Sequence, residues 1–384
     1  MGWLDRTAAA VLALGVLALL TGLLPLERVV ESLDGVVPTL VFLAALVVLA
    51  ELARRAQVFE LVAARLTVVA RGNYVVLFLL CTAFAALTTV FLNLETTAVL
   101  VTPVLLALAA RAGISPLPLA MTTVWLAGTA GLLLPVSNLT NLLAGDRLHV
   151  SAGEFAARMW LPQAAAAGVT MVFLWVFHWR LRQRGEPRYV PPEAERAKDR
   201  VLTAAAWVAC AGFAVAVLLD VEPWLAACGA AALLVVAFVV RDRAALGWGL
   251  LPWRLPAFVT GLVLIVATLG EYGLAGAMAE VTAAEPYRTA AVGAVLANLV
   301  NAVPAYLATQ TAIPVTEPDL VFALLIGTNA GALVTPWASL STLLWLETCA
   351  RHDVRVPMTR FVLTGAGLAL VAVAAATWTL VGTA

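Results

Sequence analysis

Long apolar segments alternate with short polar interruptions along the whole chain. Windows of about 20 apolar residues, the length that crosses about 30 Å of hydrocarbon, recur in both halves. They lie at 8–24, 36–55, 74–92, 117–134 and 160–180, and then at 201–219, 223–240, 256–274, 288–303, 318–334 and 358–381. This pattern predicts an all-α polytopic membrane protein with the lipid bilayer as its solvent. We expect a first membrane repeat over 1–180, a linker over 181–200 and a second membrane repeat over 201–384.

Shorter apolar pieces lie between these windows and are too short to cross a bilayer alone. They cover residues 97–111, 142–150, 304–314 and 342–350. Each begins just after a polar stretch, so we expect each to be a half-helix that resumes after a break, either in a re-entrant hairpin or in a discontinuous span.

The polar stretches correspond between the two halves. Residues 134–143 align without a gap on residues 335–344, with Pro135 on Pro336, and upstream the stretch 93–97 matches 298–301 through an Asn-Leu pair. Unwound backbone survives at membrane depth only where it lines a cavity. Matching breaks in two halves therefore indicate the binding site of a transporter.

Two amphipathic stretches suggest how the halves are related. Residues 59–71 carry Arg65 and Arg71, whereas the corresponding stretch 276–287 carries Glu280 and Glu285. Opposite charge at equivalent places predicts that the two repeats are inverted relative to the membrane.

Composition supports the membrane assignment. The chain is 63% hydrophobic and 12% charged, with a mean hydropathy of +0.98, which leaves too little polar surface for a water-soluble globule. The densest basic run, 180–200, contains three prolines and is expected to be a cytoplasmic linker, because cytoplasmic loops are rich in Arg and Lys. No basic stripe indicates nucleic acid as a partner.

The four cysteines lack metal-site spacing. Cys81, Cys210, Cys228 and Cys349 are scattered without a CxxC pair. They could be thiol ligands for a soft metalloid, but we interpret them as small buried hydrophobes. The sequence predicts no metal site and no cofactor.

Glu95 is the one carboxylate that the pattern places in a break near the middle of the bilayer. An ionised carboxylate there must pair with a cation, accept hydrogen bonds or take up a proton. Glu95 could simply cap the helix that follows, but Thr96 or Thr97 could do that without a charge in lipid. We therefore predict that Glu95 couples transport to an ion.

The breaks also supply amides, hydroxyls and free helix ends. A helix N-terminus accepts an anion or a lone-pair oxygen, and the orphan carbonyls of the preceding helix hold a cation. Any single Ser or Thr could be bonded only to its own helix, but four clusters in two matching pairs favour a shared site. The predicted substrate-binding residues are Asn93, Thr96, Ser137, Asn138, Asn141, Asn298, Asn301, Asn329, Thr335, Ser339 and Thr342.

Four stretches carry a family resemblance: 93–103, 136–141, 298–304 and 333–345. Together and in this order they resemble the ArsB-type arsenical pump membrane proteins. These are a branch of the ion transporter superfamily, which also holds citrate transporter-like proteins, divalent anion:sodium symporters and NhaD-type antiporters. The resemblance implies two inverted repeats, each with a re-entrant hairpin and a broken transmembrane helix around a central site.

By this resemblance the protein would be a multi-pass plasma-membrane exporter of arsenite or antimonite. The solute would be the neutral trihydroxide, and its transport would be driven by the proton gradient or by an attached ATPase subunit. The protein could also form a homodimer. A neutral solute suits amides and hydroxyls without a buried cation. The alternatives are a sodium-coupled carboxylate or other anion symporter and a sodium/proton antiporter. A membrane-embedded enzyme is disfavoured, because the sequence shows no nucleophile with a base, metal pair or phosphate cradle.

Overall fold

The computed structural model describes residues 3–25, 37–180, 189, 197–247, 250, 253–282 and 284–383. Within these residues every regular element is a helix. Seven helices there are long and apolar enough to cross a membrane, and a bent pair, 256–271 with 274–282 at 86°, would make an eighth. The prediction of an all-helical membrane protein is therefore confirmed.

The helices of the first half are α1 (Trp3–Leu20), α3 (Val37–Arg55), α4 (Val58–Ala70), α5 (Tyr74–Leu92), α6 (Leu94–Thr96), η1 (Thr97–Val101), α7 (Thr102–Ala112), α8 (Pro116–Thr129), η2 (Pro135–Ser137), α9 (Leu139–Leu148), α10 (Ala152–Leu174) and η3 (Trp175–Trp179). Those of the second half are α12 (Arg200–Leu218), α13 (Pro223–Arg241), η4 (Arg243–Ala245), α14 (Arg254–Glu271), α15 (Leu274–Thr282), α16 (Pro286–Leu299), α17 (Ala302–Gln310), α18 (Pro318–Ala330), α19 (Leu340–Arg351) and α20 (Met358–Val381).

Several predicted spans are shorter than expected. The windows 117–134, 288–303 and 318–334 form α8, α16 and α18, which end before the window does because irregular backbone begins there. Conversely, the piece 97–111 is not a short half-helix. The helical stretch Leu94–Ala112 starts directly after Asn93 and has the length of a membrane span.

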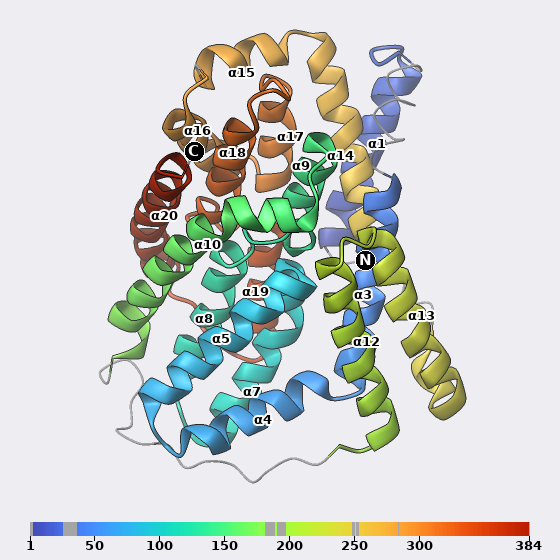
Figure 1. Ribbon diagram of the computed structural model, residues 1–384, viewed down its shortest axis with the longest axis vertical. Helices are drawn as coiled ribbons and strands as arrows, with labels where there is room; N and C mark the ends of the chain where they lie inside the picture. The colour runs from blue at the N-terminus through green and yellow to red at the C-terminus, as the bar shows by residue number, and fades with distance from the viewer. Residues whose placement is uncertain are drawn as a thin grey trace.

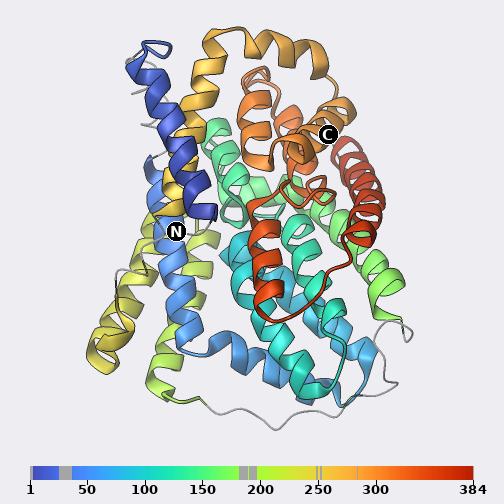
Figure 2. The ribbon, with the colours of Figure 1, turned by 180° about the vertical axis from the view of Figure 1, so that it is seen from behind.

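Two groups of helices lie side by side (Figures 1 and 2). In one group α1 packs along α14, and α3 packs along α13, which α12 also contacts. The other group contains α5–α10 and α16–α20, with α10 packed along α20. Helix α4 lies at the lower end of Figure 1 and α15 at the opposite end. Inverted halves would give this arrangement, and the inversion itself stays a prediction.

Helix α18 runs through the core of the second group. Each of its residues from Leu320 to Ala330 is buried. It packs on α16 with almost no space between the backbones, because a Cβ at Gly327 would lie 2.0 Å from the Ala290 carbonyl oxygen and one at Gly331 would lie 2.4 Å from the Ala294 Cβ. This close approach between small residues is a common way to pack membrane helices. It holds the last turn of α18 in the middle of the molecule.

The predicted linker 181–200 falls mostly outside the described residues, but Tyr189 is described and buried. Its ring lies edge-on to Tyr74 at 5.5 Å between centroids, and its hydroxyl donates to the Thr67 carbonyl at 2.9 Å. The chain between the halves is thus fastened to α4 and α5. At the end of the linker Asp199 caps α12.

The amphipathic stretch 59–71 forms α4, with Arg65 and Arg71 exposed. Its expected counterpart, 276–287, is not one helix. Helix α15 ends at Thr282, and Glu285 instead caps α16 by accepting hydrogen bonds from the Tyr287 and Arg288 amides.

Candidate functional site

The first break of each half is made by an asparagine in a strained backbone conformation. Asn93 has φ 73° and ψ 169°, and Asn301 has φ 137° and ψ 155°. This region is normally limited to glycine. Each side chain caps the helix that follows: Asn93 accepts from the Thr96 amide at 2.8 Å, and Asn301 from the Val303 amide at 3.2 Å.

The expected pairing of Asn93 with Asn298 is therefore wrong. Asn301, three residues later, has the role of Asn93. The Asn-Leu pair that the two stretches share misled the alignment, because a cap is set by the backbone turn and not by the neighbouring residue type.

The second break of each half follows the prediction. Pro135 begins the short turn η2, and Pro336 lies in a turn, so neither proline belongs to an α-helix. Extended residues then cap the next helices. Asn138 accepts from the Thr140 amide at the start of α9, and Ser339 accepts from the Ser341 amide at the start of α19.

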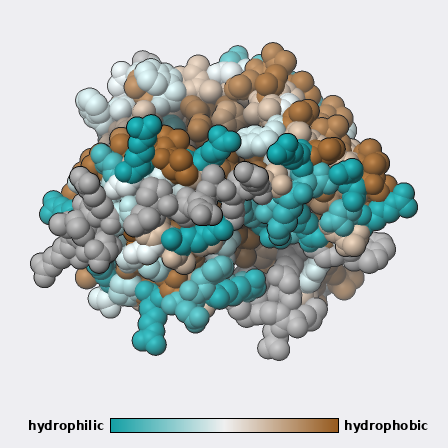
Figure 3. Space-filling model, turned by 90° about the horizontal axis from the view of Figure 1, so that it is seen from below, coloured by the Kyte–Doolittle hydropathy of each residue, from teal (hydrophilic) through white to brown (hydrophobic). Residues whose placement is uncertain are grey.

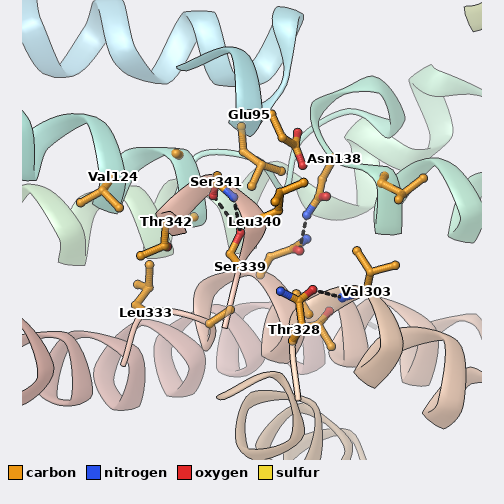
Figure 4. A pocket seen from close by; sticks show the side chains of 18 of the residues that line it. Glu95, Val124, Asn138, Val303, Thr328, Leu333, Ser339, Leu340, Ser341 and Thr342 are labelled. Atoms are coloured by element: carbon orange, nitrogen blue, oxygen red, sulfur yellow. Dashed lines mark hydrogen bonds between the residues drawn. The ribbon is translucent and has the colours of Figure 1, made fainter. Parts of the chain in front are cut away.

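All four breaks meet at one central cavity (Figure 4). It leaves about 20 Å³ for the centres of water-sized molecules, which is room for one or two waters. Its polar lining residues are Glu95, Asn138, Asn301, Thr328, Asn329, Ser339, Ser341 and Thr342. No Arg or Lys belongs to the described lining.

An amide network joins the two halves beside this cavity. The Oδ1 of Asn329, near the end of α18, accepts from the Asn138 amide nitrogen and from the Thr140 hydroxyl, the latter at 3.1 Å. The Nδ2 of Asn329 donates to Asn141 Oδ1 at 2.8 Å. Asn141 in turn donates to the carbonyls of Gly131 and Leu134 at 2.7 and 3.1 Å, which fastens the irregular stretch before α9.

Asn298 holds the other irregular stretch. Its Nδ2 donates to the Ala294 and Gly331 carbonyls, and its Oδ1 accepts from the amides of Val334 and Thr335 at 3.1 and 3.0 Å. The Thr335 hydroxyl donates to the Asn298 carbonyl at 2.9 Å. Asn298 and Thr335 thus shape the turn between α18 and α19 and do not line the cavity.

The predicted residues divide into two sets. Those that line the cavity are Glu95, Asn138, Asn301, Asn329, Ser339 and Thr342. Those that do not belong to its lining are Asn93, Thr96, Ser137, Asn141, Asn298 and Thr335. Ser137, for example, donates to the Val90 carbonyl at 2.9 Å and so fastens its turn to α5.

Some lining residues were not among the predicted substrate-binding residues. Ser341 and Thr328 lie in the polar stretches themselves, and proximity to Ser339 and Asn329 was a usable signal. Phe258 and Val259 reach the cavity from α14, in the other helix group. Apolar residues on an apolar helix carry no sequence signal for such a role.

Glu95 has a buried oxygen without a partner. Its Oε2 is inaccessible to solvent, and no described group forms a hydrogen bond with it. A carboxylate oxygen in that position can receive a proton or a bound solute's hydroxyl. Among the described residues no group of three His, Cys, Asp or Glu could hold a metal ion, and none of the four free cysteines lines the cavity.

Membrane-spanning helices with breaks around a buried polar cavity define a membrane transporter. The chain belongs to the citrate transporter family (CitMHS), whose sequence model matches residues 1–327. Its curated relatives include the arsenical pump membrane protein of Escherichia coli, 28% identical over 73% of this chain and 71% of the relative. A putative arsenical pump membrane protein of Bacillus subtilis is 24% identical over 80% of this chain and 78% of the relative.

A solved structure supports the fold. The YdaH transporter of Alcanivorax borkumensis superposes with a TM-score of 0.60 at 14% identity, covering 92% of this chain and 86% of that one. At this identity the likeness concerns the fold alone. The family is one of membrane transporters and not of enzymes, as predicted.

Proposed function

We propose that the protein is a secondary active transporter that exports arsenite or antimonite as the neutral trihydroxide in exchange for protons. The observation that carries this proposal is the lining of the central cavity. Its polar groups are amides and hydroxyls, with one carboxylate and no cationic side chain in the described lining, and the rest of that lining is apolar. Such a lining suits a small neutral polyol, because every hydroxyl finds a donor or acceptor and no charge needs a partner.

The size of the cavity favours the same solute class. Space for one or two waters is less than the three hydroxyls of a trihydroxide need, so side chains must move when it binds, and citrate is several times larger again. A tricarboxylate would also need positive charge or many N–H donors, and Arg is the usual partner for carboxylates. The names of the relatives, arsenical pump membrane proteins, point to the same solute.

Glu95 is the proposed proton carrier. Glu95 lines the same cavity as the proposed solute groups, and its Oε2 forms no hydrogen bond with a described residue. Protonation and solute binding at one small site exclude each other if both use that oxygen, which is the condition for exchange. Direct proton coupling needs no ATPase subunit.

The proposed orientation in the plasma membrane follows from charge. The end that bears α4 carries the exposed Arg65 and Arg71 and the start of the basic run after Trp179, and hydrophilic side chains are spread over it (Figure 3). The opposite end bears the exposed Glu280 and Glu285. By the positive-inside tendency the α4 end, with the central linker, is cytoplasmic.

Everted membrane vesicles that contain this protein test the function. We expect arsenite to accumulate when a proton gradient, acid inside, is imposed, and not when a sodium gradient replaces it. Vesicles from cells without the protein are the control. The assay contains no added ATPase or ATP.

Two results would contradict the proposal. Sodium-driven uptake of citrate or another carboxylate, without arsenite uptake, would favour an anion symporter. Sodium/proton exchange that needs no third solute would favour an antiporter.

A further inference from the structure

The two halves of the chain place helix ends at equivalent positions around the cavity, but the side chains at these positions differ. In each half the N-cap of the next helix lies eight positions after the C-cap of the preceding one, Asn138 after Ala130 and Ser339 after Gly331. Counting from these caps, Gly128 in α8 has the position that Asn329 has in α18, and Ser341 has the position of Thr140. Counted in the same way from the strained caps Asn93 and Asn301, Glu95 in the first half has the position that Val303 has in the second half.

On one side, which we term the amide side, polar side chains fill these positions. It consists of Asn138, Thr140, Asn141 and Asn329. Asn329 makes three hydrogen bonds to the other three residues, and Thr140 and Asn141 do not belong to the cavity lining. A solute could enter here only by breaking these hydrogen bonds, and its own hydrogen bonds would at best replace them.

The opposite side, which we term the serine side, lacks the central amide. It consists of Gly128, Ser339, Ser341 and Thr342, all of which line the cavity. Ser339 and Ser341 are within 2.8 Å of each other through their hydroxyls (Figure 4). Helix α19, which begins after Ser339, packs against α6 and α8. Glu95 of α6 and Gly128 of α8 line the same cavity as its hydroxyls.

A movable side chain closes the serine side. A Cβ at Gly128 would lie 2.6 Å from Leu333 Cδ2, so the end of this leucine occupies part of the space that an asparagine would fill. Leu333 is apolar, and only its rotamer has to change to free that space. Asn329, by contrast, is held by three hydrogen bonds.

We propose that the transported solute occupies the serine side, and that Gly128 and Leu333 together set how large that solute can be. The proposal deepens the transport function argued above, since it assigns the solute to one half of the central cavity. Its chemistry is that of a small polyhydroxylated molecule: Ser339, Ser341 and Thr342 exchange hydrogen bonds with its hydroxyl groups, and the free oxygen of Glu95 accepts one more.

Thiol labelling tests the assignment to the serine side without any solute. The background is the full chain with its four cysteines replaced by alanine, at positions 81, 210, 228 and 349. Ser341→Cys and Thr140→Cys form a matched pair at equivalent positions. With a small methanethiosulfonate reagent, we expect Ser341→Cys to react at least about tenfold faster than Thr140→Cys.

Two further substitutions change the space in opposite directions. Gly128→Asn restores the missing amide and should slow labelling of Ser341→Cys at least about tenfold, whereas Leu333→Ala should speed it. Because the second variant removes atoms, it tests the proposal even if Gly128→Asn folds poorly. Equal rates at the two thiols, or rates that neither substitution changes, would overturn the proposal.

Transport separates this inference from the proposed function. In everted vesicles Gly128→Asn should abolish arsenite uptake, whereas Gly145→Ala should retain it, because a Cβ there meets only ordinary contacts with Pro135, away from the cavity. If the thiols label as expected but the wild type does not transport arsenite, arsenite is not the solute, whereas the assignment of the solute to the serine side is supported. If Gly128→Asn still transports arsenite, the assignment of the solute to the serine side is wrong, whereas arsenite stays the proposed solute.

Discussion

Asn138 and Asn329 belong to breaks in opposite halves of the chain, and the Asn138 amide nitrogen donates a hydrogen bond to Asn329 Oδ1. Asn138 is the N-cap of α9, and Asn329 is the next-to-last residue of α18. One side-chain contact thus joins the start of a helix in the first half of the chain to the end of a helix in the second half. It positions the backbone on which the proposed transport site depends.

Asn329→Leu is expected to destabilise the fold. The substitution leaves the Asn138 amide nitrogen, the Thr140 hydroxyl and Asn141 Oδ1 without their partner in a buried place. We expect the free energy of unfolding to fall by about 1–3 kcal/mol in total, since such bonds are worth less in membranes than in water-soluble cores. Thermal unfolding in detergent measures it.

Thr328→Val is the matched control for that variant. The Thr328 hydroxyl donates only to carbonyls of its own helix, at 2.9 Å to Leu324. Removing it should lower stability by less than about 1 kcal/mol. If both variants unfold alike, the network does not join the halves energetically.

Glu95→Gln should leave the protein folded and remove its response to protons. The amide keeps the shape of the carboxyl group but cannot titrate. Gradient-driven arsenite accumulation in everted vesicles should fall at least about tenfold. Glu347→Gln is the control, because Glu347 is paired with Arg351 on the surface, away from the cavity. Wild-type pH dependence in Glu95→Gln would contradict the assignment.

Asn301→Gly and Asn301→Ala should differ strongly in stability. Both lose the cap bond to Val303 and the bond to the Trp337 carbonyl, but only glycine adopts φ 137° without strain. We expect Ala to be less stable than Gly by about 1–3 kcal/mol. At Asn73, a cap with φ −84°, the same pair of substitutions should differ less. Similar differences at both positions would mean that Asn301 stores no strain.

Local chemistry made the breaks predictable. A proline lacks an N–H donor, so Pro135 and Pro336 within polar stretches indicated where α-helices are interrupted. The membrane class followed from apolar length alone. These features depend on a few neighbouring residues, and the structure confirms them.

Contacts between distant segments were not predictable in this way. Nothing next to Asn141 or Asn329 in sequence indicates that they bond to each other, because packing of α9 against α18 decides it. Packing likewise brings Phe258 from α14 to the cavity and sends Asn298 to the turn behind it. A polar residue in a break can line a cavity or support it, and sequence does not distinguish the two roles.

Arg158 links three helices, and we expect its loss to destabilise the fold. From α10 its guanidinium donates to Asp319 at the start of α18 at 2.8 Å, and to the Thr383 hydroxyl and the Leu380 carbonyl at the end of α20 at 2.8 and 2.9 Å. Because the pair with Asp319 is partly exposed, screening reduces its value, and we expect Arg158→Ala to cost about 1–2 kcal/mol. Arg158→Lys should recover only part, since an ammonium group lacks the planar set of donors.

The comparison is Arg351→Ala, which breaks a pair with Glu347 whose side chains are 71% and 37% exposed. Exposed pairs within one helix contribute little, so this variant should lose less than about 0.5 kcal/mol. Unfolding temperatures of the three variants and the wild type in one detergent decide between the expectations. If Arg158→Ala and Arg351→Ala have the same unfolding temperature, the hydrogen bonds of Arg158 do not stabilise the fold. Packing of α10 along α20 then holds the helix ends together without the guanidinium group.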